Sequence, residues 1–208
     1  MSNNKLEFFY DCSSPWTYLA FSEIENLTTR HKLDLIWKPI LVGGVFNAVN
    51  PSVYATRANP VKEKSKYSNK DLKDWCKVRG IVINWPKVFP VNSVKAMRGA
   101  FYAIEQGAIS EYSSKVFYTY WTEGKDISQL AILSEIINSL NMNEEEFFSY
   151  IEEETTKQAL KLNTQELMDR GGFGSPTIYV NETDMFFGND RLQLIAVSYT
   201  HLTLPTKA

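Results

Sequence analysis

The sequence predicts an α/β fold in which a long helical segment interrupts a small unit of strands and helices. Residues 6–38 show a strand-like, a helix-like and a second strand-like pattern, and residues 177–187 contain two short strand-like runs that lead into a last helix. Between these regions the apolar residues recur at helical spacing, without a strand pattern. The predicted organisation is a discontinuous domain of residues 1–45 and 172–208 around an all-helical insertion domain of residues 46–171.

The first strand is predicted at the aromatic run of residues 6–10, which ends in a turn rich in helix-capping residues. A helix is expected to follow at once, because Ser14 is a common N-cap residue and Pro15 suits the first helical position. Apolar residues recur at helical spacing as far as His31, and residues 33–38 then alternate as a second strand. Such a βαβ unit has parallel strands and a right-handed crossover.

The middle of the chain shows two kinds of pattern. Residues 47–70 are polar and interrupted by prolines, whereas helical periodicity dominates from there to about Arg170. Asn143 followed by Glu146 resembles a capping box at the start of one of these helices. The glycine pair after Arg170 is expected to end the last helix of the insertion.

The end of the chain returns to strand patterns. Residues 177–180 and 185–187 are predicted to form a hairpin, and a final helix is expected to begin near Asn189. The residues after about 198 are β-branched and include Pro205, which does not suit the continuation of a helix. We therefore expect a tail after about 198 that is either non-native or a genuine irregular segment.

The composition excludes several classes of function. A net charge of -2 and a pI near 5.8 provide no positive field for nucleic acid. No stretch approaches the roughly 20 apolar residues needed to cross a membrane, so we expect a cytoplasmic protein without a membrane partner. Cys12 and Cys76 are too few for a disulfide framework or a zinc site, and with only His31 and His201 a histidine-based metal site or catalytic triad has little material. No metal cofactor is expected.

The order of the elements, a βαβ unit, a helical insertion and a ββα unit, is that of a thioredoxin-like fold. In this fold the active residue lies where the first strand turns into the first helix, because the helix N-terminus favours a thiolate. Residues 14–17, Ser-Pro-Trp-Thr, occupy this position. A redox protein would have a cysteine at each end of the motif, so Ser14 and Thr17 exclude disulfide exchange here. Cys12 is expected to be a buried packing thiol.

Residues 8–20, FFYDCSSPWTYLA, resemble the opening of 2-hydroxychromene-2-carboxylate isomerases and kappa-class glutathione transferases. Further segments resemble these enzymes in the same order along the chain. They are Pro39 with Gly43, Gly44 and Phe46; Asn59 and Pro60 with Lys64 and Tyr67; Phe89 and Pro90 with Asn92, Ser93, Ala96 and Arg98; Gly174 to Thr177; and Phe187 to Arg191. The resemblance extends from Lys5 to Ala196, and its specificity lies in the ordered set.

The resemblance implies a homodimer that uses glutathione as its cofactor, with Ser14 as the catalytic residue that donates a hydrogen bond to the glutathione sulfur. The residues implied to contact glutathione are Asn59, Lys64, Ser175, Pro176, Gly188, Asn189 and Asp190. The residues implied to contact the substrate are Trp16, Lys38 and Asn92.

Several of these residues also have a purely structural interpretation. Ser14, Asn189 and Asp190 are of types that commonly cap helices, and Lys64 lies among other surface lysines. The bond before Pro176 is expected to be cis from the thioredoxin-like order of elements, which would leave the preceding backbone to pair with an extended peptide.

The predicted function is that of a glutathione-dependent isomerase of the 2-hydroxychromene-2-carboxylate type, in which a thiolate adds reversibly to a conjugated aromatic substrate. Trp16, Phe46, Trp85 and Trp121 suggest an aromatic pocket for a small aromatic or conjugated-carbonyl molecule. A kappa-like glutathione transferase is the alternative in the same fold. The alternative of another class is a non-catalytic module that binds glutathione or a peptide.

Overall fold

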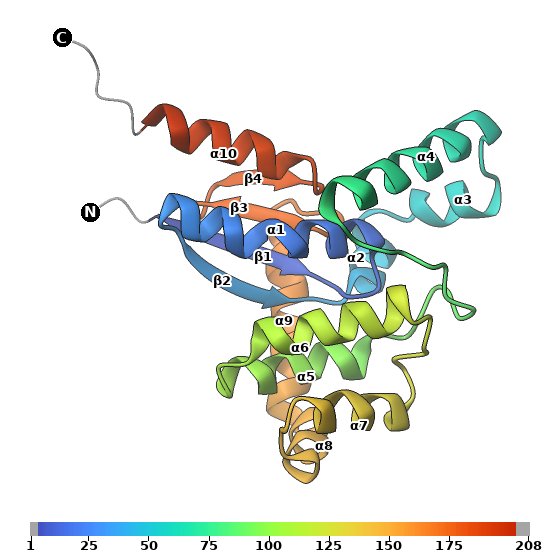
Figure 1. Ribbon diagram of the computed structural model, residues 1–208, viewed down its shortest axis with the longest axis vertical. Helices are drawn as coiled ribbons and strands as arrows, with labels where there is room; N and C mark the ends of the chain where they lie inside the picture. The colour runs from blue at the N-terminus through green and yellow to red at the C-terminus, as the bar shows by residue number, and fades with distance from the viewer. Residues whose placement is uncertain (1–3, 203–208) are drawn as a thin grey trace.

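The computed structural model describes residues 4–202 and confirms the predicted α/β fold (Figure 1). Strand β1 (Lys5–Tyr10) lies between β2 (Asp34–Pro39), which is parallel to it, and β3 (Thr177–Val180), which is antiparallel. Strand β4 (Asp184–Phe187) pairs with β3 and completes a sheet of order β2-β1-β3-β4. The predicted βαβ unit and the predicted hairpin are therefore both present.

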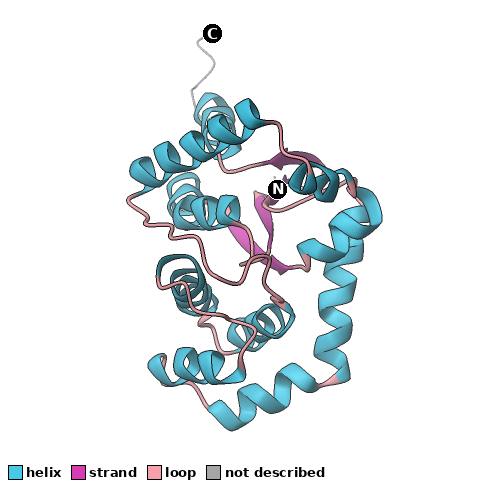
Figure 2. Ribbon diagram, turned by 90° about the vertical axis from the view of Figure 1, so that its right-hand side faces the viewer, coloured by secondary structure: helices cyan, strands magenta, loops and turns pink. Residues whose placement is uncertain are grey.

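Helices cover both faces of this sheet (Figures 1 and 2). Phe8 and Tyr10 belong to the main apolar cluster, together with residues of α1 (Pro15–His31) and α10 (Arg191–Leu202). Phe9 points to the opposite face, because successive side chains of a strand alternate, and it belongs to a smaller cluster with Val45 and Leu167. Both faces of the sheet thus take part in apolar packing.

In the described part of the chain, the segment between β2 and β3 forms helices joined by loops and contains no strand. They are α2 (Val42–Val49), α3 (Ser52–Ala58), α4 (Lys62–Arg79), α5 (Val94–Glu105), α6 (Ile109–Phe117), the π-helical turn η1 (Tyr118–Thr122), α7 (Leu130–Ser139), α8 (Glu144–Glu152) and α9 (Glu154–Asp169). Asn143 caps α8 as predicted, since its Oδ1 accepts a hydrogen bond of 3.2 Å from the Glu146 N–H. The main apolar cluster includes residues of α5 to α8 as well as of the sheet.

Helices α2, α3 and α4 occupy much of the polar stretch of residues 47–70, in which the sequence showed no helical periodicity. The reason is that α3 and α4, which form most of this stretch, bury little. Helix α3 has no buried residue, and Leu72 is the buried residue of α4. A helix without a broad buried stripe leaves no periodic apolar pattern in the sequence. Figure 1 shows α3 and α4 projecting away from the sheet.

The C-terminal helix is longer than predicted. Helix α10 continues past residue 198 to Leu202, and Tyr199 is buried with its ring 5.9 Å from that of His31. The rest of the predicted tail, residues 203–208, lies outside the described residues. Within residues 4–202, no helix combines the length and the apolar character needed to span a bilayer.

Candidate active site

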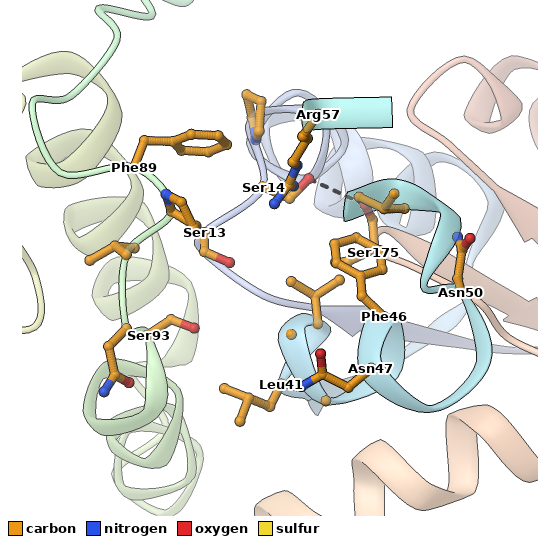
Figure 3. Close-up of a pocket in the computed structure, with 18 of the residues that line it drawn as sticks. Ser13, Ser14, Leu41, Phe46, Asn47, Asn50, Arg57, Phe89, Ser93 and Ser175 are labelled. Carbon is orange, nitrogen blue, oxygen red and sulfur yellow. Dashed lines mark hydrogen bonds between the residues drawn. The ribbon is translucent and has the colours of Figure 1, made fainter. Parts of the chain in front are cut away.

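Ser14 lies at the N-cap of α1, directly after the turn that follows β1, as predicted. Its Oγ accepts a hydrogen bond of 3.3 Å from the Thr17 N–H. The same hydroxyl donates to the carbonyl oxygen of Ser175 at 3.2 Å, a contact drawn in Figure 3. The side chain therefore caps the helix and also joins the first part of the chain to the loop before β3.

The loop before β3 has the geometry that the thioredoxin-like order predicted, since the Ser175–Pro176 bond is cis. The buried Ser175 hydroxyl accepts a hydrogen bond from the Asp11 N–H at 3.0 Å and lies 2.8 Å from the hydroxyl of Thr17. Thr17 is fully buried. Both positions that a redox relative would fill with cysteines thus carry hydroxyls in a hydrogen-bonded network.

Asp11 is a buried residue of this site that sequence reasoning left without a role. Its carboxylate accepts hydrogen bonds from the Ser13 N–H at 2.9 Å, the Val42 N–H at 2.8 Å and the Ser93 hydroxyl at 3.1 Å. Burial raises the pKa of Asp11, and these donors oppose the rise. The carboxylate therefore holds together the Ser14 turn, the start of α2 and the start of α5.

Neither cysteine provides a reactive thiolate. Cys12 is buried, as predicted, and burial and the nearby Asp11 raise the pKa of its thiol well above the ordinary value. Partial burial also raises the pKa of Cys76. Within residues 4–202 no group of His, Cys, Asp and Glu side chains is arranged to hold a metal ion. Any thiolate chemistry at Ser14 must use a thiol from a ligand.

A cavity of about 720 Å³ opens beside Ser14 (Figure 3). It lies between the start of α1, helices α2 and α3, and the loop that leads into α5. Its aromatic lining residues are Trp16, Phe46, Tyr54, Trp85, Phe89 and Phe187. Such a wall suits a planar apolar ligand.

The predicted aromatic pocket is therefore present, with one correction. Trp121 does not line the cavity, because it is fully buried and its indole N–H donates to the Cys12 carbonyl at 2.8 Å. It supports the cavity wall from behind, with its ring 5.7 Å from that of Trp85. Trp121 is thus part of the core.

Of the three residues predicted to contact the substrate, two line the cavity and one does not. Trp16 and Asn92 line the cavity, and the Asn92 Oδ1 also accepts a hydrogen bond from the Val94 N–H at 3.2 Å. Lys38 does not join them. Its ammonium group lies 2.9 Å from Glu166 and 3.9 Å from Glu7, in an ionic cluster beneath the sheet that includes α9. The pairing gives Lys38 a structural role away from Ser14.

Asn59 and Lys64 line a second cavity of about 480 Å³, and Lys64 belongs to the first turn of α4. This cavity shares Pro15, Trp16, Arg57 and Trp85 with the first one. The predicted glutathione-contacting residues of the insertion thus lie next to the Ser14 cavity, separated from it by side chains.

Gly188, Asn189 and Asp190 form the turn between β4 and α10, where Gly188 has a φ of 107° that favours glycine. Asn189 is buried, and its Oδ1 has no hydrogen-bond partner among the described residues. Asp190 is half-exposed and lies 3.3 Å from Arg191. These residues line neither cavity, although the neighbouring Phe187 lines the first.

Arg57 is a charged residue of the cavity to which the sequence analysis gave no role. It lies on α3 and belongs to both cavities. In the sequence, Arg57 lies two positions before Asn59, and this was the only sign that it could belong to the site. The folded structure was needed to show that its charge lies at the cavity.

Two relatives are similar to the chain over nearly its whole length. The 2-hydroxychromene-2-carboxylate isomerase of Pseudomonas putida is 28% identical over 194 residues, which cover 91% of each chain. Glutathione S-transferase kappa 2 of Caenorhabditis elegans is 25% identical over 210 residues, covering 94% of this chain and 92% of the relative. These relatives indicate a group that includes isomerases and glutathione transferases.

A solved structure described as 2-hydroxychromene-2-carboxylate isomerase superposes with a TM-score of 0.79, at 23% identity and with 95% of each chain covered. The likeness supports the fold. The family profile of DSBA-like thioredoxin domains matches residues 5–200. The chain therefore belongs to the DSBA-like thioredoxin-domain family.

Proposed function

We propose that the protein is a glutathione-dependent isomerase of the 2-hydroxychromene-2-carboxylate type that acts on a small aromatic or conjugated-carbonyl substrate. The observation that carries the proposal is the Ser14 hydroxyl, which lies at the N-terminus of α1 and bonds to the backbone before a cis proline, beside an aromatic cavity. The relatives support this proposal, since they are named as a 2-hydroxychromene-2-carboxylate isomerase and as kappa-class glutathione transferases.

The site residues fit glutathione in charge and in hydrogen bonding. Lys64 would hold the glycyl carboxylate and Asn59 the tripeptide backbone, since both line the second cavity. At the start of α10, the carboxylate of the half-exposed Asp190 is an acceptor that suits the γ-glutamyl ammonium group. The helix N-terminus there suits the neighbouring carboxylate.

The Ser14 hydroxyl is the movable part of the site. Its hydrogen is directed at the Ser175 carbonyl, so donation to a sulfur requires rotation about the Cβ–Oγ bond. The rotation leaves the Ser175 carbonyl available to an N–H group of an extended peptide. The Ser14 hydroxyl would thus donate to the sulfur of the bound thiol in place of the Ser175 carbonyl, and the backbone of Ser14 would not need to move.

Ser14 and α1 would lower the pKa of a thiol held at this place. A hydrogen bond to the charged form and the positive end of the helix dipole both favour a thiolate. When bound, glutathione would supply the nucleophile that adds reversibly to a conjugated double bond and allows its rotation. The aromatic walls of the cavity would hold the substrate and limit access of water.

The proposal is tested by incubation with an aromatic ylidene-pyruvate, with and without reduced glutathione. We expect the absorbance of the substrate to change only when glutathione is present, while the glutathione concentration stays constant. Consumption of glutathione, with formation of a stable adduct, would instead indicate the kappa-like transferase. Glutathione binding without any turnover would indicate the non-catalytic module.

The proposal includes a homodimer and a cytoplasmic location. Light scattering of the purified protein measures the first, and a molar mass equal to that of a single chain would contradict it. Cell fractionation measures the second.

A further inference from the structure

Arg57 provides the one charge of the Ser14 cavity among the lining residues that the structure describes. No acidic residue lines this cavity, and none of the ion pairs within residues 4–202 includes Arg57. Its side chain points from α3 toward the cavity in Figure 3. Arg57 is exposed and the other side chains that line the cavity are uncharged, so its guanidinium is free to pair with a ligand that carries a negative charge.

Two aromatic rings hold this guanidinium in place. Its Cζ lies 5.6 Å from the ring centre of Phe46 and 5.4 Å from that of Phe89, distances at which a cation interacts with an aromatic face. Both rings line the first cavity and neither lines the second. The guanidinium of Arg57 is therefore stacked on rings of the Ser14 cavity, although Arg57 also lines the cavity of Lys64.

Other arginines of the described chain show what a guanidinium stacked on a ring does here. Arg170 lies 3.9 Å from the ring centre of Tyr179 and binds the Glu7 carboxylate through both terminal nitrogens, one of them at 3.1 Å. Arg79 lies 5.4 Å from the Trp75 ring centre and 3.3 Å from a Glu23 oxygen. Each of the two guanidinium groups thus lies beside a ring and also pairs with a carboxylate. Arg57 has the rings without the carboxylate.

We propose that Arg57 is an anion subsite that selects substrates with a carboxylate attached to an aromatic or conjugated group. The planar fork of an arginine matches a carboxylate, and Phe46 and Phe89 beside it suit the planar part of such a molecule. This inference rests on the proposed function, since it assigns the substrate class of the same cavity. The carboxylates of glutathione have separate candidates at Lys64 and at the start of α10.

The test compares 2-naphthoate with 2-naphthamide, which differ in charge but hardly in shape. Binding to the purified protein without glutathione is followed by tryptophan fluorescence, because Trp16 and Trp85 line the cavity. We expect naphthoate to bind about tenfold more tightly than the amide, as for a hydrogen bond to a charged group. Arg57→Gln should remove this preference, and Arg57→Lys should retain part of it. Circular dichroism checks that the variants are folded.

Lys66→Gln is the matched control, because Lys66 is an exposed cation of α4 that lines neither cavity. It should keep the preference of the unmodified protein. The inference is overturned if the unmodified protein shows no preference for naphthoate, or if Arg57→Gln keeps it.

Calorimetry of glutathione binding separates this inference from the proposed function. Loss of the naphthoate preference in Arg57→Gln, with unchanged glutathione affinity, supports both. If the unmodified protein does not bind glutathione but Arg57→Gln still abolishes the preference, the proposed function fails and the subsite stands. If Arg57→Gln weakens glutathione binding and leaves the preference intact, Arg57 belongs to the glutathione site and the inference fails.

Discussion

The hydroxyl of Ser14 donates a hydrogen bond to the carbonyl oxygen of Ser175 at 3.2 Å, across 161 positions of sequence. The same oxygen caps α1 by accepting from the Thr17 N–H. The cap needs a lone pair of the oxygen, whereas a contact to a thiol needs the hydroxyl hydrogen. A structural and a catalytic role of Ser14 can therefore be separated by experiment.

Ser14→Ala should raise the pKa of the thiol of bound glutathione toward its free value, because the hydrogen bond to the thiolate is lost. The rate at neutral pH should fall, and the fall should shrink as the pH rises and the thiol ionises without help. The thiolate absorbance of the complex measures the pKa, and a pH series measures the rate. Loss of the cap alone should cost about 1 kcal/mol of stability.

Ser22→Ala is the control for this experiment, since the Ser22 hydroxyl bonds within α1 to the Leu19 carbonyl and lies outside the Ser14 cavity. It should leave the thiol titration unchanged. Full activity of Ser14→Ala at neutral pH, with an unshifted titration, would remove Ser14 from the mechanism and leave it as a cap.

Asp11→Asn should destabilise the protein by about 1–3 kcal/mol. One oxygen of Asp11 accepts from the Ser13 N–H and the other from the Val42 N–H, so an amide nitrogen at either place leaves a backbone donor without an acceptor. Urea denaturation measures the loss. Asp34→Asn, at an exposed position of β2, is the control and should change the midpoint little. Equal midpoints for the two variants would contradict the role given to Asp11.

Asp190→Ala should weaken the binding of glutathione about tenfold, because it removes a charge-assisted contact to the ammonium group. Calorimetry gives the dissociation constant. Asp184→Ala, an exposed carboxylate at the start of β4, should bind glutathione as the unmodified protein does. An unchanged constant for Asp190→Ala would limit Asp190 to its position at the start of α10.

The ionic cluster on α9 should make stability depend on pH. Partial burial raises the pKa of Glu166, but Lys38 and Arg170 outweigh burial and hold it below the ordinary value. The folded state therefore binds this proton less tightly than the unfolded state. The stabilisation is present above the ordinary pKa and is lost as the pH falls through the lowered value.

Glu166→Gln tests this pH dependence. Its urea midpoint should be lower than that of the unmodified protein near neutral pH, and the difference should shrink between about pH 5 and about pH 3. Glu154→Gln, at the other end of the same helix and without a described ion pair, is a suitable control. A difference that stays constant over this range would show that the charge of Glu166 is not responsible.

Local patterns in the sequence were enough to predict where Ser14 lies in the fold. An aromatic strand, a capping serine and a proline in the first turn place Ser14 at a helix N-terminus, and each of these preferences acts over a few residues. The absence of cysteine from residues 14 and 17 likewise needs no structure to exclude a dithiol. The cis bond before Pro176 was predicted from the order of the strands and helices. This order is a property of the whole chain, but it can be read from the sequence.

The tertiary structure alone decided which side chains share the site. Arg57 enters the cavity because α2 and the loop before α5 bring Phe46 and Phe89 to it, and Lys38 leaves the site because α9 brings Glu166 beneath the sheet. Trp121 joins the core for the same kind of reason. Such contacts connect residues far apart in sequence, and their energies depend on distance and burial, which no local pattern encodes.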